Sequence, residues 1–159
     1  MSKKVSPIPK GYNSITPYLI IKGAAQAIEY YKSVFGATEV FRMDQPDGKV
    51  GHAELKIGDS RLMLADEFPD MEFKSPRAFG GSPLHIHLYT EGVDAVVAQA
   101  VAAGAKVVRP VADQFYGDRL GTVSDPWGHV WHVSTHIEDL TEEEMKKRAA
   151  AAMQNKPAA

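Results

Sequence analysis

Two hexapeptides, FGATEV at residues 35–40 and AGAKVV at residues 103–108, share a pattern of small and β-branched residues at an offset of 68. Each follows a segment with helical periodicity and precedes a β-rich run. The order strand, helix and three strands holds on both sides of residues 66–83. A chance resemblance of two α+β segments is the alternative, and the matching order of elements makes it the weaker one. The repeat therefore predicts two similar βαβββ modules.

The first module begins with ITPYLIIKG, a β-branched and aromatic run that predicts a strand. Residues 24–35 predict a helix that ends at Gly36, and its apolar stripe consists of Ile28, Tyr31, Val34 and Phe35. The strands TEVFRM, KVGHAELKI and RLMLAD follow, with turn signals at Asp47-Gly48 and Gly58-Asp59-Ser60.

The second module begins with the strand LHIHLYT. Residues 93–103 predict a helix that ends at Gly104, and its apolar stripe consists of Val93, Val96, Val97, Ala100 and Val101. KVVRPVA, RLGTVSD and GHVWHVST supply three more strands. The predicted organisation is an N-terminal arm at 1–14, a first module at 15–66, a connecting loop with a possible lid function at 67–83, a second module at 84–137, and a C-terminal helix and tail at 138–159. That last helix starts with a capping box, Thr141 and Glu144.

Composition excludes several classes of protein. The chain has no cysteine, so disulfides, thiolate zinc sites and cysteine nucleophiles are excluded. A net charge of −2 with dispersed Lys and Arg gives no electrostatic reason to expect nucleic acid as a partner. No apolar run reaches the roughly 18–20 residues that span a bilayer. Lys3 and Lys4 precede no apolar segment of the secretory type, so a cytoplasmic location is expected.

Alternation along each strand separates a helix-facing side from an opposite side. The apolar positions, such as Leu19, Leu55 and Trp131, belong to the helix side. The opposite side takes polar and mixed positions: Thr16, Tyr18, His52, Glu54, Lys56, Arg61, Met63, His85, His87, Tyr89, Val130, His132 and Ser134. This face is either a solvated sheet surface or the wall of a polar cavity.

Three histidines crowd the segment SDPWGHVWHVSTH, but alternation places only His132 on the polar face. DPWG reads as a turn, and His129 and His136 are expected to be peripheral. The partners of His132 are then expected to be His85 and His87 from the first strand of the same module.

The chain resembles the vicinal-oxygen-chelate superfamily of glyoxalase and bleomycin resistance proteins, and within it the PhnB-like group. The resemblance rests on three stretches: PYLIIKGAAQAIEYYKSVFGA, GHAELKIGDSRLMLADE and FYGDRLGTVSDPWGHVWHVSTHIEDLTEEEM. It implies an α+β fold, in which two βαβββ modules form a cup-shaped mixed sheet with helices on the outer face. It also implies a homodimer and a small-molecule ligand, with no nucleic acid and no membrane partner.

The resemblance also implies four metal-ligand positions, which fall on Thr16, Met63, His85 and His132. Thr16 to His85 and Met63 to His132 are both offsets of 69 residues, as a duplicated module requires. Metal-dependent members typically carry His or Gln, Glu, His and Glu at these positions. Here only His85 and His132 are good ligands, because a thioether such as Met63 binds hard or borderline ions poorly.

Three hypotheses follow. In the first, His85 and His132, helped by His87 or Glu54, hold Zn, Fe, Mn or Ni, and the protein is a lyase, isomerase or dioxygenase acting on vicinal oxygens, with Glu54 as a candidate base. In the second, the protein is a metal-free antibiotic-sequestering protein. The candidate ligand contacts are Tyr18, Met63, His87, Tyr89, Phe115, Tyr116, Arg119 and Trp127, with His85 and His132 as further polar contacts. In the third, the polar face is simply solvated.

Two of these candidates also have plain structural interpretations. Asp118 and Arg119, in the GDR stretch of residues 117–119, are as consistent with a salt-bridged turn as with ligand contacts at the rim of a cavity. For Glu54, a pair with Lys56 or Arg61 across the sheet is a commoner arrangement than a catalytic base.

Overall fold

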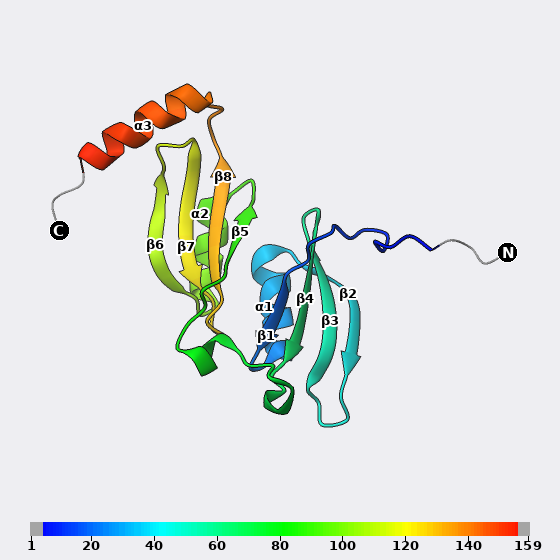
Figure 1. The fold of residues 1–159 in the computed structure, drawn as a ribbon. Coiled ribbons are helices and arrows are strands. Elements are labelled where there is room, and N and C mark those ends of the chain that lie inside the picture. Colours follow the sequence, from blue (N-terminus) through cyan, green and yellow to red (C-terminus); the bar gives the residue numbers. More distant parts are fainter. Residues whose placement is uncertain (1–4, 156–159) are drawn as a thin grey trace. The chain divides into compact units, whose positions relative to one another are not determined.

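A computed structural model describes residues 5–155 of the protein (Figure 1). Residues 1–4 of the predicted arm and 156–159 of the predicted tail lie outside the described residues. The chain divides into two compact units between Ser82 and Pro83. Each unit contains one complete βαβββ module, as the internal repeat predicts.

The first module consists of β1 (Tyr18–Ile21), α1 (Ala24–Phe35), β2 (Thr38–Asp44), β3 (Val50–Ile57) and β4 (Ser60–Asp66). Its sheet has the strand order β1-β4-β3-β2. β1 runs parallel to β4, and the other two pairings are antiparallel. The crossover from β1 through α1 brings the first strand beside the last, so the sheet is mixed.

The second module repeats this topology with β5 (His85–Tyr89), α2 (Val93–Ala102), β6 (Lys106–Asp113), β7 (Asp118–Ser124) and β8 (Val130–His136). Its strand order is β5-β8-β7-β6, with β5 parallel to β8. The predicted α+β class with two βαβββ modules is therefore confirmed. α1 occupies the predicted residues, and its C-terminal Gly36 adopts the left-handed conformation that ends it.

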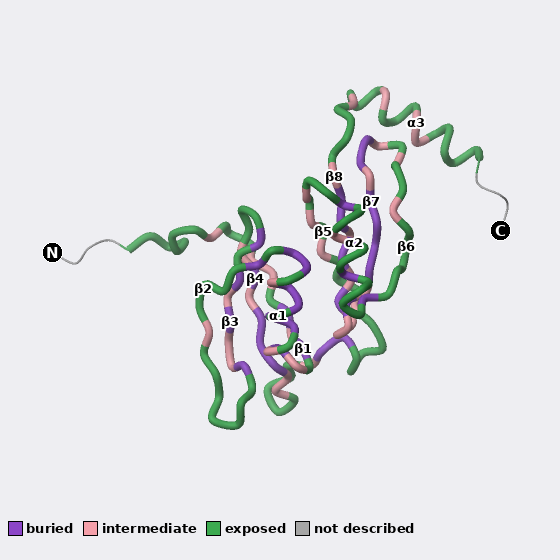
Figure 2. Tube along the Cα trace, turned by 180° about the vertical axis from the view of Figure 1, so that it is seen from behind, coloured by how far each residue is buried: buried purple, intermediate pink, exposed green. Residues whose placement is uncertain are grey.

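Each core lies between the helix and one face of the sheet of its module (Figure 2). In the first module all four residues of the predicted helical stripe are buried, as are the alternate strand residues Leu19, Ala53, Leu55 and Leu64. In the second module Val93, Val97 and Ala100 are buried, but Val101 is 39% exposed. The prediction for Val101 was wrong because α2 ends at the next residue, beyond which no helical turn covers it.

The segment between the modules contains two short 3-10 helices, η1 (Pro69–Met71) and η2 (Pro76–Phe79), where the sequence predicted a loop. The Glu67 carboxylate accepts hydrogen bonds from the backbone N–H (2.9 Å) and the hydroxyl (2.5 Å) of the buried Ser75. These bonds hold the pKa of Glu67 below its usual value. The contact folds this segment back onto itself.

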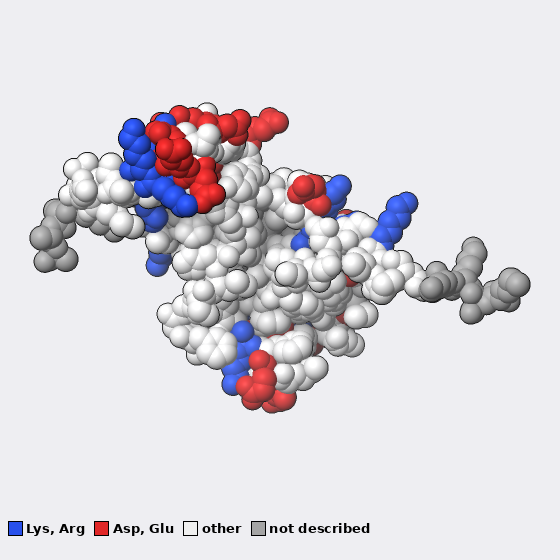
Figure 3. Space-filling model, turned by 45° about the horizontal axis from the view of Figure 1, so that its top comes forward, with Lys and Arg blue, Asp and Glu red and all other residues white. Residues whose placement is uncertain are grey.

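The last helix, α3 (Glu142–Gln154), begins as the capping box predicts, with the Thr141 hydroxyl accepting a 3.2 Å hydrogen bond from the Glu144 N–H. Arg148 pairs with Glu144 and with Glu138. Acidic and basic side chains consequently gather over α3 (Figure 3). No helix within residues 5–155 is long and apolar enough to cross a membrane.

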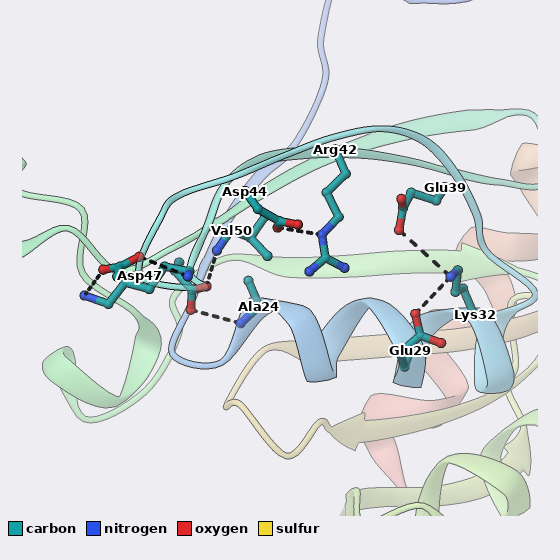
Figure 4. Close-up of polar contacts among 10 residues, drawn as sticks. Ala24, Glu29, Lys32, Glu39, Arg42, Asp44, Asp47 and Val50 are labelled. Atoms are coloured by element: carbon teal, nitrogen blue, oxygen red, sulfur yellow. Dashed lines mark hydrogen bonds and ion pairs between the residues drawn. The ribbon is translucent and has the colours of Figure 1, made fainter.

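Polar contacts fix the helix of the first module against its strands (Figure 4). On its outer side Lys32 pairs with Glu29 at 2.9 Å and lies 3.9 Å from Glu39 of β2. At its start, the carboxylate of Asp66 accepts hydrogen bonds from Ala24 at 3.0 Å and Val50 at 2.7 Å. The last residue of β4 thus ties the helix to β3.

Candidate functional site

Strand register confirms that the two modules present equivalent positions on their polar faces. Tyr18 pairs with Met63 in the first module, and His87 pairs with His132 in the second. Both members of the second pair lie 69 residues after their counterparts. The register thus supports the offset of 69 that relates Thr16 to His85.

One row of residues crosses the whole polar face of each sheet. In the second module the row is Arg109, Thr122, His132 and His87, one residue from each of β6, β7, β8 and β5. In the first module the equivalent row is Phe41, Glu54, Met63 and Tyr18. The scaffold is duplicated, but the two faces differ in chemistry: one row is cationic and rich in imidazole, and the other is aromatic with a carboxylate.

Two of the predicted ligand residues are in direct contact. Nδ1 of His85 lies 2.9 Å from Nε2 of His132, and Nδ1 of His132 lies 2.8 Å from the hydroxyl of the buried Thr122. One proton in each contact satisfies this chain with both imidazoles neutral. Burial lowers the pKa of His132, and the nearby His85, His87 and Arg109 lower it further.

The donor set does not fit the divalent-metal site that the resemblance implies. The four equivalent positions supply two imidazoles, a hydroxyl (Thr16) and a thioether (Met63), with no carboxylate. Within residues 5–155, no group of three or more His, Asp or Glu side chains is arranged to hold a metal ion. Catalytic zinc sites use three protein ligands, and the harder metals favour carboxylate oxygen. His85 and His132 alone fall short of either requirement.

A second polar cluster lies at the other end of the same sheet. The buried carboxylate of Asp118 accepts a 2.9 Å hydrogen bond from the Tyr89 hydroxyl and lies 2.7 Å from Nδ1 of His136. Nε2 of His136 is 2.9 Å from Asp139. Hydrogen bonding to Asp118, and then to Asp139, raises the pKa of His136. The candidate ligand contact Arg119 pairs with Asp94 of α2 and Asp113 of β6.

The first module carries a hydrogen-bonded chain on its polar face. The Tyr18 hydroxyl lies 2.8 Å from Nδ1 of His52, and Nε2 of His52 lies 3.2 Å from the Glu54 carboxylate. The Tyr12 hydroxyl donates a hydrogen bond to the other oxygen of Glu54. Arg61 lies over the Tyr12 ring, 5.2 Å from its centroid. The hydrogen bonds from Tyr12 and then His52 lower the pKa of Glu54, although partial burial opposes them.

This chain corrects the prediction that Glu54 pairs with Lys56 or Arg61. Its hydrogen-bond partners are Tyr12 and His52, and Arg61 acts on it only through the charge of its guanidinium. Sequence reasoning missed Tyr12, which lies in the predicted N-terminal arm. Only its aromatic character, in an otherwise polar stretch, could have singled it out.

Two further candidate contacts, Phe115 and Tyr116, line a pocket of about 430 Å³ beside α3 rather than the polar face of the sheet. The helix side of the pocket consists of Glu142, Met145, Lys146 and Ala149. The turn predicted at DPWG is present, with Gly128 in a left-handed conformation. His129 is 7% exposed: its N–H and that of Trp127 bind the Asp125 carboxylate, which folds the turn inward.

Comparison with known proteins agrees with this architecture. The family model described as "Glyoxalase/Bleomycin resistance protein/Dioxygenase superfamily" matches residues 12–133. An uncharacterized protein of Mycobacterium bovis is 39% identical over 136 residues, which cover 84% of this chain and 90% of that protein.

Two solved structures share the fold. The PhnB protein of Bacillus cereus has a TM-score of 0.63 at 19% identity, covering 77% of this chain and 99% of that chain. The fosfomycin resistance protein FosX of Listeria monocytogenes, complexed with Mn(II) and sulfate, has a TM-score of 0.60 at 17% identity, covering 86% and 97%. The family match and the paired βαβββ modules together lead to one conclusion: this chain belongs to the glyoxalase/bleomycin resistance/dioxygenase superfamily, and its structural neighbours include a PhnB protein.

Proposed function

We propose that this protein binds a small organic molecule on the polar face of its second-module sheet without needing a metal ion. The observation that carries the proposal is the direct contact of His85 with His132, continued to Thr122. Among residues 5–155, both ring nitrogens of His132 and Nδ1 of His85 have a protein partner, and Nε2 of His85 has none. The pair therefore acts as a pre-arranged hydrogen-bonding group for a ligand.

Aromatic side chains beside this group supply the apolar contacts that such a ligand needs. Tyr89 is 59% exposed, and its ring stacks on that of His87 with centroids 4.7 Å apart. The Tyr89 hydroxyl is held by Asp118, which fixes the ring in place. We propose that His87 and Tyr89 contact the ligand. Tyr18 and Met63, which match His87 and His132 in the first module, remain proposed ligand contacts.

A metal-dependent lyase, isomerase or dioxygenase is the second candidate. It is favoured by one observation, that the two imidazoles at ligand-equivalent positions lie on the same face within 2.9 Å of each other. In this alternative a divalent ion would require a further ligand from the substrate or solvent. Glu54 would be the candidate base, since its carboxylate is the ionisable group at the centre of the first-module row.

A single experiment separates these functions. Protein without a histidine tag is incubated with Zn, Fe, Mn or Ni ions, desalted and assayed for metal content, and a fragment library is then screened by NMR with and without EDTA. Binding of fragments to the His85 region in EDTA, with less than a tenth of an equivalent of metal retained, supports the proposal. One equivalent of metal, lost in both His85→Gln and His132→Gln, would instead establish the metal site.

The homodimer expected from the resemblance is also a proposal. Size-exclusion chromatography with light scattering tests it directly, with twice the chain mass of 17.4 kDa as the expected result.

A further inference from the structure

Cationic and imidazole side chains gather at one end of the polar face of the second-module sheet. The central row holds Arg109, His132 and His87, and the next row holds Lys106, paired with Ser124, and His85, paired with Val130. Five nitrogen-bearing side chains therefore share two adjacent rows.

An irregularity in β6 brings the two permanent cations to this face. Lys106 and Arg109 are three residues apart and would point to opposite sides of a regular strand. The register shifts between Val107 and Arg109, as in a β-bulge, so that Lys106 pairs with Ser124 and Arg109 with Thr122. Ser124 and Thr122 are alternate residues of β7 and share one face, so their partners share it too. The effect of Arg109 on the pKa of His132 agrees with this placement.

Carboxylates are absent from these rows. The acidic residues within β5 to β8 are Asp113 and Asp118, at the opposite end of the sheet. Asp113 pairs with Arg119, and Asp118 binds Tyr89 and His136. Neither therefore neutralises the cationic rows.

Two of the nitrogen donors have no hydrogen-bonding partner in the described part of the chain. Arg109 is exposed and forms neither a hydrogen bond nor an ion pair with residues 5–155. His87 contacts the Tyr89 and His132 rings, but among the same residues its ring nitrogens have no hydrogen bond. A guanidinium and an imidazole with free N–H groups are suited to an oxyanion, since guanidinium matches the planar spacing of its oxygens.

We propose that these two rows form an oxyanion-binding site, in which Arg109 and His87 bind a carboxylate, phosphonate or phosphate group of the ligand and the His85–His132 pair orients it. The site rests on the proposed function and names the class of ligand: a small organic anion. Neutral imidazoles suffice, because each carries one N–H donor. Lys106, in the row next to that of Arg109, adds to the positive potential of the site.

NMR titration tests this site with defined probes. Methylphosphonate is added to protein labelled with ¹⁵N, and the Arg109 Nε–H signal and the histidine ring signals are followed. Saturable shifts confined to Arg109, His85, His87 and His132 are expected. Arg109→Gln should weaken binding about tenfold, the loss typical of one charge-assisted hydrogen bond, and Arg109→Lys should recover part of it. Lys147→Gln, which removes an exposed positive charge from α3, is the matched control and should change affinity less than twofold.

The same titration identifies the source of the anionic group. Acetate presents a carboxylate, methylphosphonate a tetrahedral anion, and dimethyl methylphosphonate an uncharged ester of similar shape. If the site binds an oxyanion, the uncharged ester should cause no saturable shifts. The anion that binds with the higher affinity then indicates whether the ligand carries a carboxylate or a tetrahedral group. Arg109→Gln binding the anions as tightly as the unmodified protein would overturn the site. If uncharged fragments still bind near His85 in that case, the proposed function stands without it; if nothing binds this face, both fail.

Discussion

Asp66 and Thr135 occupy equivalent positions in the two modules, and each accepts a hydrogen bond from the first backbone N–H of its helix. The carboxylate of Asp66 lies 3.0 Å from the nitrogen of Ala24, and the hydroxyl of Thr135 lies 3.1 Å from that of Val93. In both cases the side chain at the end of the last strand fixes the start of the helix that packs on its own sheet. An oxygen acceptor at this point satisfies an N–H that the helix itself leaves unpaired.

The first prediction concerns Asp66. The Asp66 carboxylate, in a residue that is only 8% exposed, accepts hydrogen bonds from the backbone N–H groups of Gly23, Ala24 and Val50. Replacement by alanine removes all three bonds. Asp66→Ala should therefore lower the free energy of unfolding by about 3 kcal/mol. Urea unfolding followed by circular dichroism measures the change. Asp59→Ala, which removes a carboxylate from an exposed turn, should cost less than about 0.5 kcal/mol; equal losses in the two variants would contradict the role of Asp66.

The second prediction concerns the pKa of Glu54. The Tyr12 hydroxyl is the largest cause that lowers it, so Tyr12→Phe should raise this pKa toward its usual value. Tyr18→Phe is the matched control, because Tyr18 binds His52 rather than Glu54 and should leave the pKa nearly unchanged. Titration of the ¹³C carboxyl signal of Glu54 provides the measurement. A carboxyl group whose pKa is lower in the folded state stabilises the fold at pH values above its unfolded-state pKa. This stabilisation is lost as the pH falls through the folded-state pKa, so Tyr12→Phe should also lessen the loss of stability on acidification.

The third prediction concerns pH dependence at His136. Asp118 and Asp139 raise the pKa of this histidine in the folded protein. A histidine whose pKa is higher in the folded state stabilises the fold fully at pH values below its unfolded-state pKa of about 6.5. This stabilisation disappears as the pH rises through the folded-state pKa. His136→Gln should therefore be less stable than the unmodified protein near pH 5.5 and closer to it near pH 8.5. A stability difference that is the same at both pH values would refute the coupling.

The fourth prediction concerns Gly117, which has φ of 91°. A Cβ at this position would lie 2.3 Å from the carbonyl oxygen of Glu138. The Gly117 carbonyl also accepts hydrogen bonds from Ile137 and Glu138, so neither segment can move away without losing them. Gly48 shares the left-handed backbone (φ 84°) but has open space around it.

Gly48→Ala should thus cost about 1–2 kcal/mol from backbone strain alone. Gly117→Ala should cost more, and should speed hydrogen exchange in the segment that leads to α3. Thermal unfolding and exchange of the Ile137 and Glu138 amides measure both effects. If both variants lose the same free energy of unfolding, the Glu138 carbonyl must move away from the added methyl group with little loss of stability.

Local patterns predicted the parts of this fold that depend on local physics. The bounds of α1 followed from its apolar stripe and from Gly36, and the N-cap of α3 followed from Thr141. Alternation also placed His132 on the same face as His85 and His87. Each of these inferences needs only the periodicity of one element, or the duplication of a module.

The features that sequence reasoning missed depend on contacts between distant residues. Tyr12 reaches Glu54 across 42 positions of sequence, and no periodicity relates them. The burial of His129 depends on how Asp125 folds the turn, and the position of Tyr116 depends on where α3 lies. The alignment of Lys106 with Arg109 requires an irregular strand, which alternation assumes to be absent.

The chain contains two copies of the same βαβββ module, and the polar faces of their two sheets carry different residues. Thr122 stands where the first module has Glu54, and His132 stands where it has Met63, while the buried residues on the reverse of each sheet hold the same register. In each module, the residues of the polar row are therefore distinct from the residues that pack under the helix on the reverse of the same sheet. Exchanging exposed members of the two rows, such as Tyr18 with His87, should therefore change the chemistry of each polar face while leaving the residues under each helix in place.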